Sequence, residues 1–115
     1  MDLGPALIAA LGTIERHGPL TPSELADLER VKRPTATRMV TRLGVEGLIL
    51  RARDPADGRS SLVSTSPRGR ELLRRLRTRR TAYLARRLRE LDSDEVTALE
   101  RAAEILERLV EGERR

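Results

Sequence analysis

The sequence predicts a mainly α-helical fold with one small β-hairpin. Apolar residues recur at helical spacing in several segments, and most of these segments begin at a proline or end before a glycine. Residues 48–65 differ, because their side chains follow the two-residue period of a β-strand. A segment rich in turn-forming residues, 54–58, divides them into two strands. The chain has 115 residues, of which 38% are hydrophobic, so we expect one compact domain with a modest core.

Composition excludes several kinds of site. Aromatic residues are 1% of the chain, which argues against a platform for stacking bases. The absence of cysteine excludes disulfides, thiolate metal sites and cysteine nucleophiles, and a single histidine leaves little for a metal site or a catalytic triad. We therefore expect no enzyme, no cofactor and no metal. No apolar stretch approaches the ~18 residues of a membrane span, so we expect a cytoplasmic protein without a membrane partner.

The charge is unevenly distributed. A net charge of +5 favours an anionic partner, most commonly nucleic acid. Residues 66–91 hold ten arginines and two glutamates, whereas residues 92–115 hold four arginines and eight acidic residues. Two interpretations stay open: the segments pair across the fold or a subunit interface, or both are solvated helix faces.

The first two helices are predicted at residues 5–17 and about 22–29. Gly18 and Pro19 end the first helix, with Gly18 available for a left-handed cap. A capping box, Thr21 to Glu24, opens the second helix, and its proline suits the first helical position. We expect this helix to bury three apolar residues, Leu25, Ala26 and Leu28.

The third helix is predicted from Pro34 to Glu46, after a short break at residues 30–33. Gly47 can serve as its C-terminal cap. Gly44 is a local weakness inside the helix, since glycine costs about 1 kcal/mol relative to alanine.

A β-hairpin with a long, charged tip follows the third helix. In its first strand, residues 48–53, the apolar residues Leu48, Leu50 and Ala52 alternate with Ile49, Arg51 and Arg53, which is the period of a strand. Its second strand, residues 59–65, supplies Leu62 and Val63 as apolar residues.

Two long helices complete the chain. Ser66 and Pro67 form a start signal for a helix that we expect to reach about Glu90. Asp92 or Ser93 can cap the last helix, whose apolar residues recur at alternating steps of three and four, as in a coiled coil. The long helix or a second subunit can supply the partner for this seam. The seam consists of Val96, Leu99, Ala103, Leu106 and Val110.

The order of elements predicts a winged helix-turn-helix lobe at residues 1–65, with the helix-turn-helix at 22–46 and the wing at 48–65. The dimerisation helices follow at 66–115. In such a lobe the second helix of the pair can enter the major groove of duplex DNA. Arg38 can bond a guanine edge with two donors, and Arg42 is placed to meet a phosphate. The candidate DNA-binding residues on this helix, at its entrance and on the first strand are Lys32, Arg33, Pro34, Thr35, Thr37, Arg38, Arg42 and Arg53.

The segment RPTATRMVTRL followed by DPADGRSSLVSTSPRGREL resembles the MarR family of transcriptional regulators, and the resemblance extends over nearly the whole chain. It implies that the helix beginning at Pro34 is the recognition helix. It also implies that Asp57 braces the wing while Arg59 enters the minor groove or meets the backbone. Without the resemblance, the residues alone also allow Asp57 and Arg59 to form only a turn pair, with no role in DNA binding.

Two departures from the family pattern stand out. The family has a further N-terminal helix that interlocks with the last two helices to build the dimer, and this chain begins at what would be the second helix. Members often sense small aromatic acids, and the pocket for such an effector would lose one wall here. Without cysteine, a thiol-oxidation switch is excluded.

The leading hypothesis is a homodimeric, sequence-specific regulator of double-stranded DNA, a repressor on a pseudo-palindromic operator, with a small-molecule effector as an additional partner. One alternative is an interaction protein that lacks its first helix and pairs with a full-length relative. Another is an architectural DNA binder without sequence preference, suggested by the arginine-rich segment between Arg68 and Arg89.

Overall fold

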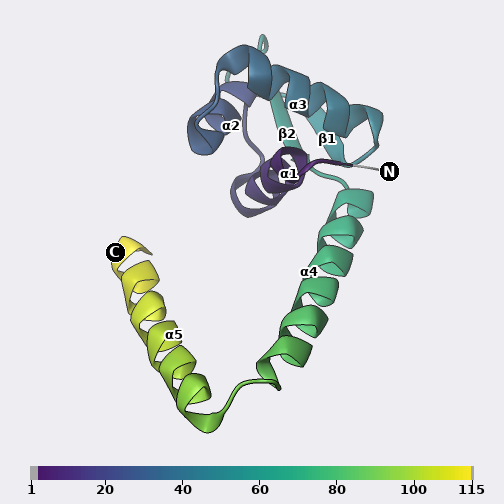
Figure 1. The fold of residues 1–115 in the computed structure, drawn as a ribbon. Helices are drawn as coiled ribbons and strands as arrows, with labels where there is room; N and C mark the ends of the chain where they lie inside the picture. Colours follow the sequence, from purple (N-terminus) through teal and green to yellow (C-terminus); the bar gives the residue numbers. More distant parts are fainter. Residues whose placement is uncertain (1–2, 115) are drawn as a thin grey trace. The chain divides into compact units, whose positions relative to one another are not determined.

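The computed structural model describes residues 3–114, which form five helices and one two-stranded antiparallel sheet (Figure 1). The chain divides into two compact units, residues 1–77 and 78–115, and each is described by itself. The elements are α1 (Pro5–His17), α2 (Pro22–Glu29), α3 (Arg33–Val45), β1 (Ile49–Arg53), β2 (Ser61–Thr65), α4 (Pro67–Leu88) and α5 (Ser93–Arg114). The mainly helical fold with a hairpin wing is therefore confirmed.

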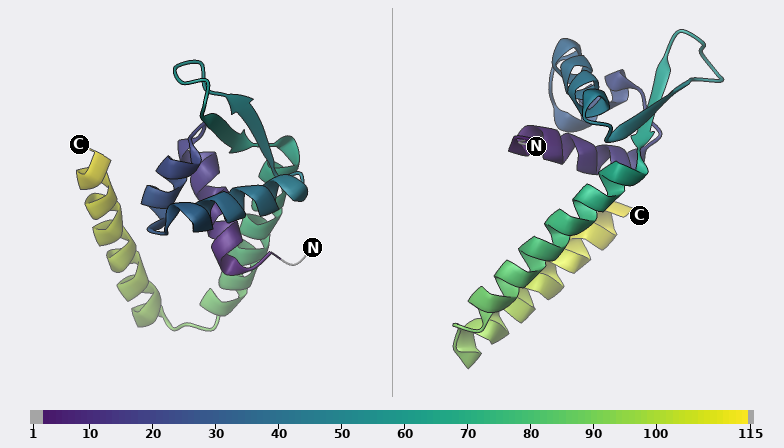
Figure 2. Two further views of the ribbon diagram at one scale, coloured as in Figure 1. Left: turned by 90° about the horizontal axis from the view of Figure 1, so that it is seen from above. Right: turned by 90° about the vertical axis from the view of Figure 1, so that its right-hand side faces the viewer.

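The core of the first unit lies between α1, α2, α3 and the base of the hairpin. The backbones of Leu20 and Val63 exchange two hydrogen bonds, of 3.0 and 2.7 Å, which add the α1–α2 connection to the edge of β2. The tip of the hairpin projects beyond the three helices (Figure 2). Eight side chains are essentially fully buried: Leu11, Ile14, Leu20, Leu25, Val40, Leu43, Leu48 and Val63.

The bounds predicted for α1 and α2 are confirmed, but two details differ. Leu28 is 47% exposed, because it lies on the side of α2 opposite the buried Ala26. Gly18 has a φ of −72°, so it is not a left-handed cap. Glycine suits this position because a Cβ would lie 2.5 Å from the carbonyl oxygen of Ile14. The left-handed residue is Arg30, which ends α2 with a φ of 56°.

Helix α3 begins one residue before the predicted start, with Lys32 as its N-cap and Pro34 in its first turn. It ends at Val45, one residue before the predicted end, and the expected glycine signal follows. Gly47 has a φ of 74°, and the next amide, that of Leu48, donates to the carbonyl oxygen of Leu43 at 3.0 Å. A Cβ added to Gly44 would meet nothing within 4 Å, so packing within the described chain does not account for this glycine.

The hairpin buries a different face from the one that alternation predicted. In the observed register Ile49 pairs with Thr65, and Arg51 pairs with Val63. Opposite residues of an antiparallel pair share a face, so the odd-numbered residues of β1 face the same side as buried Val63. Ile49 is therefore buried and Leu50 is 54% exposed.

The remaining helices have clear start signals. The Oγ of Ser66 accepts a hydrogen bond from the Gly69 amide at 3.1 Å, which confirms Ser66 as the cap of α4. In the second unit, the Asp92 carboxylate accepts from the Glu95 amide at 2.8 Å, and the Asp92 amide donates to the Glu95 carboxylate at 3.1 Å. Asp92 rather than Ser93 is thus the cap of α5.

Candidate nucleic-acid interface

A groove of about 680 Å³ lies where the beginnings of α2 and α3 meet the wing. It brings together five of the residues predicted to bind DNA. These are Arg33, Pro34, Thr37, Arg38 and Arg59. Five further lining residues were not predicted, namely Thr21, Pro22, Ser23, Ser60 and Ser61. The hydroxyl groups among them are suited to phosphate oxygens, and three guanidinium groups give the groove a positive character.

The first turn of α3 is open to an anion. Its N-cap, Lys32, makes no side-chain capping bond, and no acidic residue lies in the turn. Amide groups at a helix N-terminus and nearby cationic side chains both favour phosphate. Lys32 and Arg33 are exposed at this entrance, whereas Thr35 is half-buried and accepts a hydrogen bond of 3.3 Å from Nη2 of Arg38.

Arg42 already has a partner on its own helix. Its Nε lies 3.3 Å from Oε1 of Glu46, one turn later, and 48% of the arginine side chain stays exposed. A phosphate contact would therefore exchange one anionic partner for another.

Asp57 holds the turn at the wing tip. Its Oδ1 accepts from the backbone amide of Arg59 at 3.0 Å, and its Oδ2 accepts from the Ser60 hydroxyl at 3.4 Å. The Ser60 amide also donates to the Asp57 carbonyl at 3.0 Å. Because Asp57 binds the backbone of Arg59 and not its guanidinium, the Arg59 side chain is left to line the groove.

A second hollow, of about 290 Å³, lies on the wing itself. Arg51 and Arg53 line it together with Arg59, and the stem of Arg53 lies over Gly58 at the tip. Arg51 was not predicted as a site residue. The signal was present in the sequence, since residues two apart on a strand share a face, and Arg51 therefore lies on the face of Arg53.

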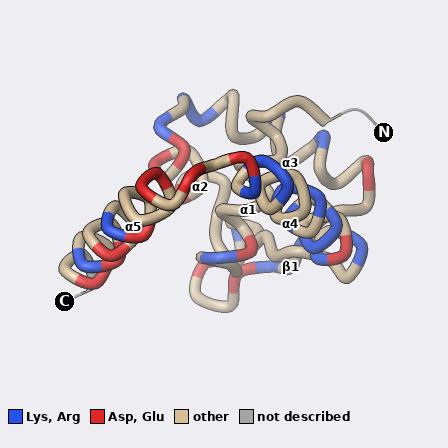
Figure 3. Tube along the Cα trace, turned by 60° about the horizontal axis from the view of Figure 1, so that its bottom comes forward, with Lys and Arg blue, Asp and Glu red and all other residues tan. Residues whose placement is uncertain are grey.

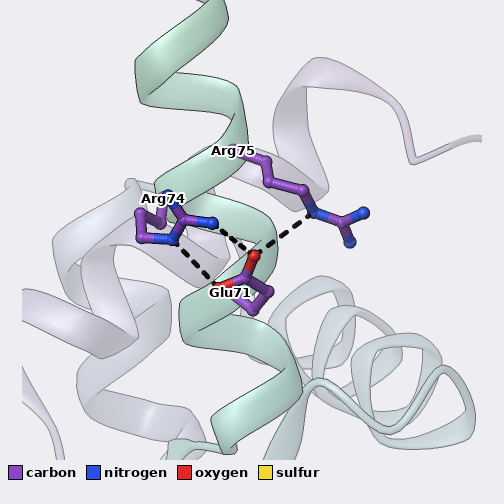
Figure 4. Close-up of polar contacts among 3 residues, drawn as sticks. All are labelled: Glu71, Arg74 and Arg75. Atoms are coloured by element: carbon purple, nitrogen blue, oxygen red, sulfur yellow. Dashed lines mark hydrogen bonds and ion pairs between the residues drawn. The ribbon is translucent and has the colours of Figure 1, made fainter.

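Arginines also dominate α4 (Figure 3). On its first turns the Glu71 carboxylate accepts two hydrogen bonds from Arg74, of 3.0 and 2.6 Å, and Arg75 Nε lies 3.9 Å away (Figure 4). The hydrogen bonds from Arg74 lower the pKa of Glu71, and the same bonds raise the pKa of Arg74. Arg70 pairs with Glu15 of α1 at 3.3 Å. Six later arginines of the basic segment have no carboxylate partner among the described residues: Arg77, Arg79, Arg80, Arg86, Arg87 and Arg89.

The predicted seam lies on α5 with its side chains open to solvent in the single chain. Val96 is half-buried, and the other four members, Leu99, Ala103, Leu106 and Val110, are exposed. A second stripe was missed, although its steps of four, three and four were readable in the sequence. It lies roughly 100° further around the helix and consists of Ala98, Ala102, Ile105 and Leu109.

Other kinds of site find no support in the described part of the chain. No helix there is both long and apolar enough to cross a membrane. Residues 3–114 also hold no cluster of histidine, aspartate and glutamate that could bind a metal.

Comparison with known proteins agrees with this geometry. Residues 4–61 match the MarR family. The chain is 40% identical over 104 residues to an HTH-type transcriptional regulator of Mycobacterium tuberculosis (strain CDC 1551 / Oshkosh), covering 90% of this chain and 73% of that protein. It is similar in structure to YusO from Bacillus subtilis, with a TM-score of 0.77, 30% identity, and coverage of 95% and 75% of the two chains. Streptococcus pneumoniae FabT, solved in complex with DNA, shares the fold at 20% identity, with a TM-score of 0.73 and coverage of 96% and 78%.

Proposed function

Because this chain belongs to the MarR family, whose members are DNA-binding transcriptional regulators and not enzymes, we propose that it represses its target genes as a homodimer bound to a pseudo-palindromic operator. The observation that carries this proposal is the groove in which the start of α3 meets the basic wing. Its proposed place of action is the cytoplasm.

In the proposed complex α3 enters the major groove with its first turns toward the base edges. Arg38 is exposed on this part of the helix and can bond a guanine with two donors. Lys32, Arg33 and the open amides of the first turn bind the flanking phosphates. Arg59, held at the tip by the turn that Asp57 braces, reaches the minor groove beside the major-groove site.

The homodimer is supported by the surface of the second unit. A single neighbouring helix cannot cover both of the adjoining apolar stripes on α5. Leu109, on the second stripe, is 66% exposed. Helix α4 also exposes Tyr83, Leu84 and Leu88. A second copy would bury these residues and set two copies of α3 about 34–36 Å apart, which is one turn of DNA. Release by a small effector is an additional part of the proposal, and it requires that the effector favour a spacing that does not fit the operator.

One observation favours a second candidate. Six arginines have no carboxylate partner among the described residues, five on α4 and Arg89 just after it, and they would suit an architectural protein that binds any duplex through its phosphates. Such a protein would show a steep salt dependence and no preferred sequence.

Selection of bound sequences from a random duplex pool tests the proposal. We expect an enriched motif with two-fold symmetry, and a particle mass in solution of two chains. Recovery of sequences without a motif would favour the architectural candidate. A monomer that binds DNA only after mixing with a longer relative would favour the interaction protein instead.

A further inference from the structure

Three β-branched residues form a stripe along the solvent side of α3. Thr37, Thr41 and Val45 are four residues apart, which places them in one row along a helix. Both threonines are exposed, and Val45 is 79% exposed. The buried side of the helix is formed by other residues, Ala36, Val40 and Leu43.

The stability of α3 does not account for this stripe. β-branched residues are weaker helix formers than alanine or leucine, and exposed side chains gain nothing from burial. Gly44, next to Val45, is weaker still, and a Cβ at this position would meet no atom within 4 Å. The outward side of the last two turns thus combines poor helix formers with open space, which fits a surface that another molecule approaches closely.

The neighbours of the stripe indicate what that molecule is. Thr37 lines the basic groove together with Arg38, so the stripe begins inside the candidate DNA interface. Arg38 and Arg42 each follow a threonine of the stripe by one residue, so cationic side chains run along its flank. A row of methyl groups whose first two members are followed by arginines suits the major groove, where thymine presents a C5-methyl group beside its O4 acceptor.

We propose that Thr37, Thr41 and Val45 read thymine methyl groups in each half of the operator. This inference rests on the proposed function and adds the class of base that α3 recognises. In a helix χ1 of Val45 has one strongly preferred rotamer and χ1 of the threonines has two, so little side-chain entropy is lost on contact.

The test is a double-mutant cycle between protein methyl groups and DNA methyl groups. Each thymine of the selected operator is replaced in turn by deoxyuridine, which lacks only the methyl group. For the wild-type protein we expect the affinity to fall about fourfold at each contacted position, the factor for burying one methyl group. Thr41→Ser, which removes a methyl from each protomer and keeps the hydroxyl, should lose about that factor for each half of the thymine operator. That variant should then be insensitive to deoxyuridine at one position.

Val45→Ala and Thr37→Ser should each become insensitive at a different position. Thr97→Ser is the matched control, because Thr97 is exposed on α5, and it should keep the wild-type response at every position. Specific binding that tolerates deoxyuridine everywhere, or variants that keep the full wild-type sensitivity, would overturn the stripe and leave the proposed function standing. Equal binding to all duplexes would overturn both.

Discussion

The hydroxyl of Ser66 donates a hydrogen bond of 2.7 Å to the carbonyl oxygen of Gly47, 19 residues earlier in the chain. The Oγ of Ser66 also accepts a hydrogen bond from the Gly69 amide, so the Ser66 side chain both caps α4 and holds its start against Gly47, just after the end of α3. The Ser66 amide also donates to the carbonyl of Leu48 at 3.0 Å. The end of α3, the base of the wing and the start of α4 therefore form one joint.

Ser66→Ala should destabilise the first unit by about 1–3 kcal/mol, since it removes a helix cap and leaves the Gly47 carbonyl without its side-chain donor. Urea unfolding followed by circular dichroism measures this. Ser64→Ala, at a half-buried position on β2, is the control and should change stability by no more than about 0.5 kcal/mol. An unchanged midpoint for the Ser66 variant would contradict the role of the joint.

Replacing each of two helical glycines by alanine should change the stability of the protein in opposite directions. A Cβ at Gly69 would overlap the Leu48 carbonyl oxygen and lie 2.8 Å from Cγ2 of Thr65, so Gly69→Ala should destabilise by about 3 kcal/mol. Gly44→Ala meets open space and should stabilise by about 1 kcal/mol. Thermal unfolding of the two variants decides this, and a shift of the same sign for both would refute the packing described for α4.

Arg38→Ala should weaken binding to the selected operator by about 1–3 kcal/mol and relax the preference at one base pair. Repeating the selection with the variant measures the relaxation. Arg59→Ala, on the wing, should keep the central motif and lose protection at the flanks of the footprint. Undiminished operator affinity of the Arg38 variant would rule out its assignment as a base-reading residue.

Arg42 and Glu46 should have opposite effects on DNA binding. Arg42→Ala should weaken binding to all sequences alike and lower the salt slope by about one. Glu46→Gln should strengthen binding, because it frees the guanidinium from its carboxylate partner and removes a negative charge near the phosphates. Titrations at several salt concentrations test both, and a sequence-dependent effect at Arg42 would contradict a phosphate role.

Glu71 should titrate below the ordinary range of a glutamate, since the hydrogen bonds from Arg74 hold its pKa down. A lowered folded-state pKa means that the stabilisation is present above the unfolded-state pKa and is lost as pH falls through the lowered value. Carboxyl NMR shifts recorded against pH give the midpoint. Arg74→Ala should raise that midpoint, whereas an unchanged midpoint would show that the pair does not form in solution.

Local signals predicted much of the fold. The bounds of α1 and α2 follow from a glycine–proline stop and a capping box, which involve only neighbouring residues. The buried face of the hairpin could not be predicted in the same way. It depends on how β2 packs against the rest of the unit, including the bridge between Val63 and Leu20, which are distant in the sequence. Alternation alone pointed to Leu50, which is exposed.

The candidate site was predicted from the third helix and the wing, and the observed groove also includes residues of α2. Arg33, Thr37 and Arg38 were found because they share the first turns of α3. Thr21 and Ser23 were missed, since only the packing of α2 on α3 brings them to the same groove. Arg42 was expected to be available for phosphate, whereas the structure gives it Glu46 as a partner.

The most direct test compares affinities for the selected operator and for a scrambled duplex of equal length, at several matched salt concentrations. Sequence-specific recognition by α3 predicts a preference of at least about 10³-fold at physiological salt, because specific binding exceeds non-specific binding by that factor or more. Equal affinity for the two duplexes at every salt concentration would contradict it.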